Sequence, residues 1–169
     1  RSATSTMNNL TNNLIVTNGT SGNQGIVIVT DANNTIEDGN NITTSGTSNS
    51  NFGIYLVTRS ISNNVTHNII NTSGTSANYG INLDTSVNSS IILNNSVFSG
   101  GSTSNNVGIR ITARSFRNNI THNRVLSRWT NDNYGTYLLN NADFSTIEYN
   151  NLTTNGTTTL NDGIISSIS

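Results

Sequence analysis

The pattern in Asn51-Phe52-Gly53-Ile54-Tyr55-Leu56 predicts the fold, because it returns along the chain at an almost constant interval. An Asn, any residue and a Gly, followed in five of six cases by an apolar residue, occur in segments 23–26, 51–54, 78–81, 106–109, 133–136 and 161–164. The glycines of these segments are 28, 27, 28, 27 and 28 residues apart. A repeat of this length predicts a solenoid, a propeller or another repeat array.

Composition limits the classes of function. A chain of 169 residues with no Cys, no Pro and a net charge of -1 fits one domain without a disulfide framework. Its charge favours neither a nucleic-acid partner nor an anionic membrane, and no apolar run approaches the roughly 18 residues of a membrane span. We therefore expect a soluble chain that does not insert into a membrane.

The high polar content could also indicate a disordered tract, because Asn, Thr and Ser make up about half of the chain. Periodicity argues against disorder. Leu, Ile, Val and Phe still form about a quarter of the residues, and they recur at fixed places in the repeat. A narrow apolar core is therefore predicted.

The repeat alternates in the manner of a β-strand. With each repeat Gly at position 0, positions 1 and 3 are apolar, which predicts a strand with one buried face. Position 12 is also apolar in most coils, as at Val65 and Ile92. The coil that begins at Gly25 departs from this rule, since Ile36 comes one residue early, and we interpret the segment around Asp38-Gly39 as a local bulge.

Position 15 is Asn in every coil, and position 17 is apolar in every coil. Parallel strands stack about 4.8 Å apart, so a column of Asn side chains can hydrogen-bond from coil to coil. The predicted structural ladder consists of Asn13, Asn40, Asn68, Asn95, Asn123 and Asn150. The recurrent glycines at positions 0 and 21 are expected to occupy turns that need a positive φ.

These patterns predict an all-β fold, a single-stranded right-handed parallel β-helix of about six coils of 27 or 28 residues. One domain spans residues 1–169. It has a partial first coil over residues 1–24, a terminal strand from Gly163, and coils that begin at Gly25, Gly53, Gly80, Gly108 and Gly135.

The coil motif resembles a known family of repeats. Gly53-Ile54-Tyr55-Leu56, Ser60 and the segment 63–70 look like the right-handed parallel β-helix repeats of carbohydrate-binding and sugar-hydrolysing proteins. Similar repeats occur in periplasmic copper-accessory proteins and in Asn/Thr-rich adhesin-like surface proteins of archaea and bacteria. The resemblance covers residues 8 to 169 and implies the fold, while activities within the family vary.

Catalytic chemistry is not indicated by the acidic residues. A glycosidase needs two carboxylates roughly 5 to 9.5 Å apart, and the eight acids fall at different positions of different coils. We expect no enzyme, with a polysaccharide lyase or hydrolase as the less favoured alternative. His67 and His122 share position 14 two coils apart, with neither a Cys nor a flanking carboxylate in view, so no metal and no cofactor are expected.

Two groups of residues are candidates for binding a glycan. The first consists of Asp84 with Arg59, Arg110 and Arg114, which forms either a solvated salt-bridge patch or a docking point for an acidic glycan. The second is Trp129, which replaces a Gly in the most variable turn beside Arg128 and Asp132, and which either binds a ligand or covers the core.

The aromatic residues just before the repeat Gly suggest a third possibility. Phe52, Tyr79 and Tyr134 share the parity of the buried positions, so an internal stack beside Val107 is predicted in preference to a sugar platform.

The function predicted from these features is an extracellular or cell-surface structural and adhesive module, with a glycan-binding module as the alternative. No terminal capping pattern is seen, so the coils are expected to stack end to end into a filament or a longer surface protein. Ile164, Ile165 and Ile168 would form the assembly edge. The expected partners are further copies of the chain or adjoining domains, and a polysaccharide. Nucleic acid is not expected, because the Arg residues of the fourth coil spread around its perimeter.

Overall fold

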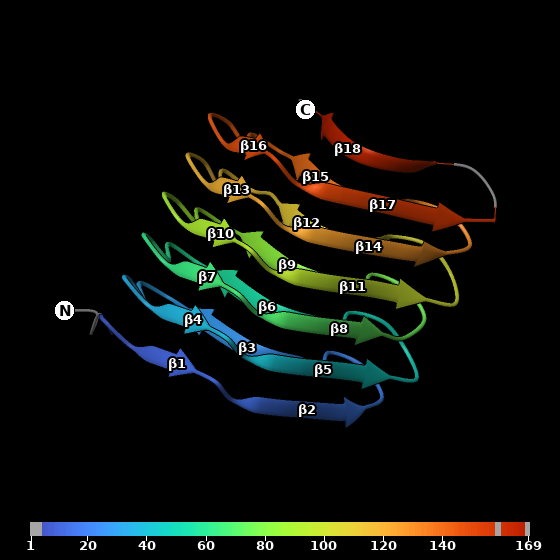
Figure 1. The fold of residues 1–169 in the computed structure, drawn as a ribbon, viewed down its shortest axis with the longest axis horizontal. Helices are drawn as coiled ribbons and strands as arrows, with labels where there is room; N and C mark the ends of the chain where they lie inside the picture. Colours follow the sequence, from blue (N-terminus) through green and yellow to red (C-terminus); the bar gives the residue numbers. More distant parts are fainter. Residues whose placement is uncertain (1–4, 158–159, 168–169) are drawn as a thin grey trace.

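A computed structural model confirms the predicted all-β parallel solenoid (Figure 1). It describes residues 5–157 and 160–167, with only the backbone of Trp129. These residues form eighteen strands in three parallel sheets of six. No described segment is a helix that could cross a membrane.

Every turn of the solenoid contributes one strand to each sheet. The first sheet contains β1 (Asn9–Thr11), β4 (Ile36–Asp38), β7 (Asn64–Thr66), β10 (Ile91–Leu93), β13 (Asn119–Thr121) and β16 (Thr146–Glu148). The second contains β2 (Leu14–Gly19), β5 (Asn41–Gly46), β8 (Ile69–Ser73), β11 (Ser96–Gly101), β14 (Arg124–Trp129) and β17 (Asn151–Gly156). The third contains β3 (Gln24–Val29), β6 (Phe52–Val57), β9 (Tyr79–Asp84), β12 (Asn106–Ile111), β15 (Asn133–Leu139) and β18 (Asn161–Ser167).

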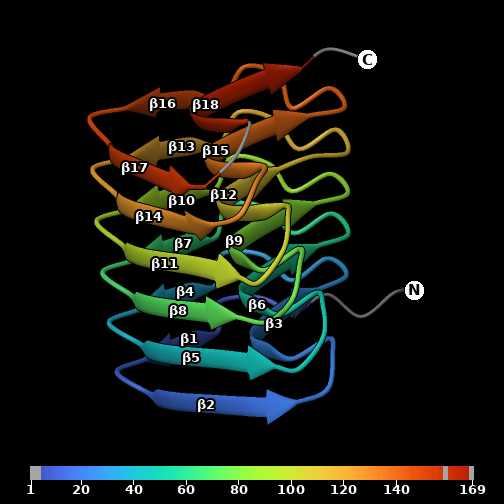
Figure 2. The same cartoon turned by 90° about the vertical axis from the view of Figure 1, so that its right-hand side faces the viewer.

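The register makes one sequence repeat equal to one turn. Ile54 pairs with Ile81 in the third sheet, and Val65 pairs with Ile92 in the first. In Figure 2 the strands of the second sheet lie in front and run from left to right while the chain climbs from β2 to β17. A chain that moves to the right in front as it rises winds right-handedly, which is the preferred hand of parallel crossovers.

The core is a narrow column of aliphatic side chains supplied by all three sheets. Positions 1 and 3 of the third sheet provide fully buried residues such as Ile54 and Leu56, and position 12 of the first sheet provides Val65 and Ile92. Burial of each such side chain contributes about 1.5 to 3 kcal/mol. The alternation seen in the sequence therefore corresponds to the inward face of each strand.

The predicted Asn ladder is present in full. Each Nδ2 donates to the Oδ1 of the Asn one turn later, over 2.9 to 3.0 Å, from Asn13 through to Asn150. The backbone N–H of each donor residue bonds the same Oδ1. From Asn40 onward the Nδ2 also donates to a backbone carbonyl of the preceding turn, such as Val65 O for Asn95. These amides satisfy one another inside the corner.

A second ladder was not predicted as such from the sequence. It consists of the Asn that precedes each repeat Gly by two residues: Asn23, Asn51, Asn78, Asn106, Asn133 and Asn161. Successive side chains are joined by Nδ2-to-Oδ1 hydrogen bonds of 2.7 to 3.4 Å. The Asn in the repeated phrase therefore has the same structural role as the Asn at position 15.

The expectation that the repeat glycines need a positive φ is wrong. Among the described glycines only Gly22 and Gly39 have one, and the corners are instead built from stacked non-Gly residues in the left-handed region, such as His67, Asn94 and His122. The repeat glycines are required for close approach. A Cβ on Gly108 would overlap the Val125 side chain inside the core.

The bulge predicted around Asp38-Gly39 is also absent. β4 pairs in uninterrupted register with β1 and β7, which places Ile36 on the outside and Glu37 at the core position between Leu10 and Val65. The predicted bulge would have kept the apolar side chain of Ile36 inside the core. The register of the neighbouring turns outweighs the cost of burying one carboxyl group.

We expect Asn95→Ala to lower the free energy of unfolding by about 3 kcal/mol. The substitution leaves the Nδ2 of Asn68 and the carbonyl of Val65 short of a partner, and each stranded buried group costs about 1 to 3 kcal/mol. Urea denaturation would measure the loss. Asn71→Ala, at an exposed position of β8, is the control and should change stability by less than about 0.5 kcal/mol. Equal losses in the two variants would contradict the ladder's role.

Gly108→Ala tests the close approach at position 0. A methyl group there meets the Val125 side chain and the carbonyl of Gly135, so we expect destabilisation of about 3 kcal/mol. Gly163 has the same repeat position, but no heavy atom lies within 4 Å of a Cβ added there. Gly163→Ala should therefore leave stability almost unchanged. Thermal unfolding of both proteins compares them directly. If Gly108→Ala left the melting temperature unchanged, the core would accommodate the added methyl group without loss of stability, which would contradict the close approach.

Candidate functional site

The outward face of the third sheet carries a cluster of aromatic and polar side chains. We name it the aromatic–arginine face and define it by Phe52, Tyr55, Tyr79, Asn82, Arg110, Tyr134 and Tyr137. Five of the nine Phe and Tyr residues of the chain are in this set. It spans four successive turns, from β6 to β15.

The repeat glycine places these rings on the outside. Gly53 faces the core, where an added Cβ would overlap Ile70, and the next residue, Ile54, is fully buried as well. Two successive inward residues break the alternation of the strand in the manner of a bulge. Phe52, before the glycine, therefore lies on the outside with Tyr55.

The prediction of an internal aromatic stack is accordingly wrong. Phe52 and Tyr79 do stack, with ring centroids 5.0 Å apart and an interplanar angle of 5°, but outside the core. The ring of Tyr55 meets Phe52 edge to face at 5.2 Å, and Tyr134 contacts Tyr137 at 4.9 Å. Strand alternation alone could not reveal the break at the glycine.

Arg110 lies in the middle of this face. Its Cζ is 5.1 Å from the centre of the Tyr79 ring, and its Nη1 donates a 3.3 Å hydrogen bond to Oδ1 of Asn82, which it helps to bury. In the described part of the chain no carboxylate forms an ion pair with Arg110. Its guanidinium is therefore held in place by an aromatic ring and an amide, with its charge uncompensated by a direct partner.

The tyrosines of the face remain neutral hydrogen-bonding groups. Burial raises the pKa values of Tyr55, Tyr79 and Tyr134 above the ordinary tyrosine value, so each phenol is protonated at neutral pH. Asp84 ends β9 on the same face, where it accepts hydrogen bonds from Thr85 at 3.1 Å and, more weakly, from the hydroxyl of Tyr55 at 3.5 Å. The face thus offers one cation, several hydroxyls and one carboxylate.

The first predicted glycan group is divided by the structure. Arg110 and Asp84 lie on the aromatic–arginine face. Arg59 pairs instead with Asp31, at 2.8 Å, and this contact lowers the pKa of Asp31. Arg114 is exposed in the next corner, in a hollow of about 320 Å³ that it lines with Thr85, Ser86, Ala113, Asn140 and Asn141.

The second predicted group lies near the end of β14. Arg128 is exposed there, in register with Gly100, which lines an adjacent hollow of about 250 Å³ with Ser73, Gly74, Gly101 and Ser102. Asp132 is half-buried in the following turn. The side chain of Trp129 lies outside the described part of the structure, so its predicted role stays a prediction.

The histidines occupy a corner and do not gather a metal-binding group. His67 Nδ1 lies 2.9 Å from Oδ1 of Asp38, so the expectation that no carboxylate flanks it is wrong. Hydrogen bonds from Thr66 and His67 lower the pKa of Asp38. His122 stacks on Tyr149 at 5.2 Å. Within the described residues no three metal-ligating side chains come together.

The chain matches no protein-family model, no curated protein and no solved structure. The choice of function therefore depends on the geometry of the aromatic–arginine face and of the sheet edges.

Proposed function

We propose that this chain is a rigid, extracellular structural and adhesive module that holds an acidic polysaccharide on its aromatic–arginine face. The observation that supports this proposal is the position of Arg110, a cation that is fixed by Tyr79 and Asn82 and that has no carboxylate partner among the described residues. The three-sheet scaffold and its two Asn ladders give the face the rigidity that a binding surface needs. Its ligand would lie along the solenoid axis across several turns.

The ring geometry favours an acidic ligand over a neutral one. Phe52 and Tyr79 cover one another, and Arg110 covers Tyr79, so these rings do not present open faces on which a neutral sugar could stack. Arg110 retains N–H donors for a carboxylate or sulfate group. The hydroxyls of Tyr55 and Tyr137 and the carboxylate of Asp84 can bind sugar hydroxyls beside it.

Binding of polygalacturonate should therefore depend on Arg110. We expect Arg110→Gln to weaken binding about fivefold, which corresponds to the ~1 kcal/mol of an exposed ion pair. Affinity electrophoresis in gels that contain polygalacturonate, with neutral dextran as the comparison polymer, measures the effect. Arg59→Gln removes the same charge from the Asp31 pair and is the matched control. Equal retention of both variants, or stronger retention by dextran, would contradict the proposal.

End-to-end stacking is the second proposed property, and the sheet edges favour it. β1, β2 and β3 lie at one edge of their sheets, and β16, β17 and β18 lie at the other. In the described structure the Oδ1 of Asn13 receives no ladder bond, and the Nδ2 of Asn150 donates to Ile120 alone. Parallel strands and amides of a second copy, or of an adjoining domain of a longer chain, can pair with both edges in the same polarity.

The predicted assembly residues differ in their orientation. Ile164 is 52% exposed, although its register partner Thr136 is fully buried, which places Ile164 on the uncovered core surface at this edge. Ile165 pairs with Tyr137 and shares the outward face of the sheet. Ile168 lies outside the described residues.

Ile164→Glu should therefore abolish association that Ile165→Glu leaves intact. A charge at the core surface prevents a second turn from covering it, whereas a charge on the outward face stays in water. Light scattering after size-exclusion chromatography, over a range of protein concentrations, measures the mass of each variant. A wild-type chain that remains monomeric at millimolar concentration would refute stacking between copies.

A further inference from the structure

Glu37 is a carboxylic acid in the hydrophobic core. It lies on β4, directly between Leu10 of β1 and Val65 of β7, and its side chain is fully buried. Neither carboxyl oxygen has a side-chain hydrogen-bond partner among the described residues. Other turns place aliphatic residues here: Leu10, Val65, Ile92, Ile120 and Ile147.

No charged group inside the solenoid compensates Glu37. Among the described residues it is the one buried Asp, Glu, Arg or His. On the adjacent strands β1 and β7 there is no titratable residue. Asp38, the next residue on β4, is on the other side of the strand, bound to Thr66 and His67. Burial raises the pKa of Glu37 to about 8, against a smaller opposing effect of its own backbone, so the carboxyl group is protonated in the closed structure at neutral pH.

Glu37 lies close to one end of the described solenoid. The first two strands of the first turn, β1 and β2, form the single described layer that covers it on that side. This pair of strands, called the first turn below, packs on one described neighbour only. Leu10 and Ile15, the core side chains of the first turn, are only partly buried. A solenoid unit that packs on one neighbour has fewer contacts to break on opening than a unit packed between two neighbours.

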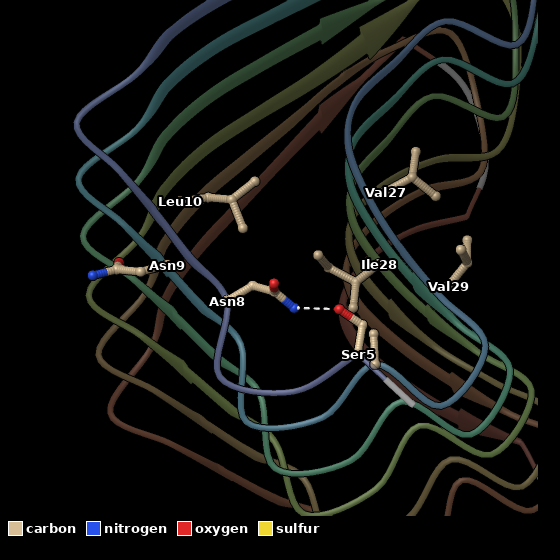
Figure 3. Close-up of a pocket in the computed structure, with 8 residues that line it drawn as sticks. Ser5, Asn8, Asn9, Leu10, Val27, Ile28 and Val29 are labelled. Carbon is tan, nitrogen blue, oxygen red and sulfur yellow. Dashed lines mark hydrogen bonds between the residues drawn. The ribbon is translucent and has the colours of Figure 1, made fainter. Parts of the chain in front are cut away.

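A hollow of about 470 Å³ is lined by residues of segment 5–10, which includes part of β1, and by residues of segment 27–32, which includes part of β3. Figure 3 shows Leu10 and Ile28 pointing toward each other across it, whereas Asn9, Val27 and Val29 point outward. A 2.9 Å hydrogen bond between Asn8 and Ser5 lies at its edge. Opening of the first turn would join this hollow to the space around Glu37.

We propose that Glu37 makes the first turn of the solenoid a cap controlled by a proton. While the carboxyl group is neutral, β1 and β2 stay paired with β4 and β5. When the proton is lost, the carboxylate reaches water by separating β1 and β2 from the second turn. The released edge of β4 and β5 is then free for another parallel strand.

The direction of the pH effect follows from the raised pKa. An acid with a pKa of 4.5 when hydrated and about 8 when buried favours the closed state fully below pH 4.5. That preference is lost progressively as the pH rises to 8. If the Glu37 carboxyl group becomes fully hydrated on opening, the equilibrium constant for opening the first turn rises on the order of a few hundredfold between pH 5 and pH 8. Opening of the first turn would also replace the surface that a second, stacked copy contacts, and this consequence rests on the proposed stacking. The opening itself does not depend on it.

Amide hydrogen exchange of the wild-type chain, corrected for the intrinsic pH dependence, tests the cap. The reporting amides are Asn12, which donates to Asp38, and Ile36 and Asn41, which donate to the first turn. Their protection should fall by a few hundredfold from pH 5 to pH 8, while that of Ile91 and Ser96 in the middle of the solenoid stays unchanged. These readouts involve neither a polysaccharide nor association, so they stand apart from the tests of the proposed function.

Three variants complete the experiment. Glu37→Leu restores the aliphatic pattern and should keep the first turn protected at both pH values, and Glu37→Gln should also remove the pH dependence. Glu148→Gln changes an exposed acid on β16 and should behave as the wild type does. Three results would overturn the proposal: equal wild-type protection at pH 5 and pH 8, an unchanged pH response in Glu37→Leu, or an equal loss of protection in the middle turns.

Discussion

The hydrogen bond between asparagine amides one turn apart sets the register of the whole solenoid. In both ladders an amide donates forward and accepts from behind, so the columns are satisfied only while successive turns remain in the same register. A slip by one residue would leave buried amides without partners and would also turn the aliphatic side chains outward. Register, core and outward face are thus linked through the same few side chains.

The repeat glycines have a consequence beyond packing. Because Gly53 and Ile54 both face the core, the residue before the glycine is carried to the outside. This gathers Phe52, Tyr79 and Tyr134 with the outward residues two positions after the Gly, including Arg110. The same local break that lets each turn approach the next also creates the surface proposed to bind a polysaccharide.

Glu37 shows how strongly the stack constrains one turn. Local preference would place Ile36 inside, yet the ladders and strands on both sides hold β4 in the common register and keep the carboxyl group in the core. The resulting conflict lies next to the first turn, where it can be relieved by local opening. In the middle of the solenoid the same residue would have at least two turns on each of its sides, whereas β1 is the one described strand on one side of β4. Its position beside the edge strand β1 is therefore what the proposed proton-controlled cap depends on.

The architecture could be predicted from the repeat pattern alone. The 27- or 28-residue period, the inward positions 1, 3, 12 and 17 and the Asn at position 15 were sufficient for a parallel solenoid of about six turns, because a strict period must place equivalent residues above one another. The side on which the aromatic rings lie, the partner of Arg59 and the burial of Glu37 could be seen only in the folded chain. Each of these depends on contacts between turns that one repeat does not contain. A glycine that faces the core together with the next residue interrupts the inward and outward alternation of its strand. The register of the neighbouring turns can keep a polar side chain in the core although that side chain would be more stable in water.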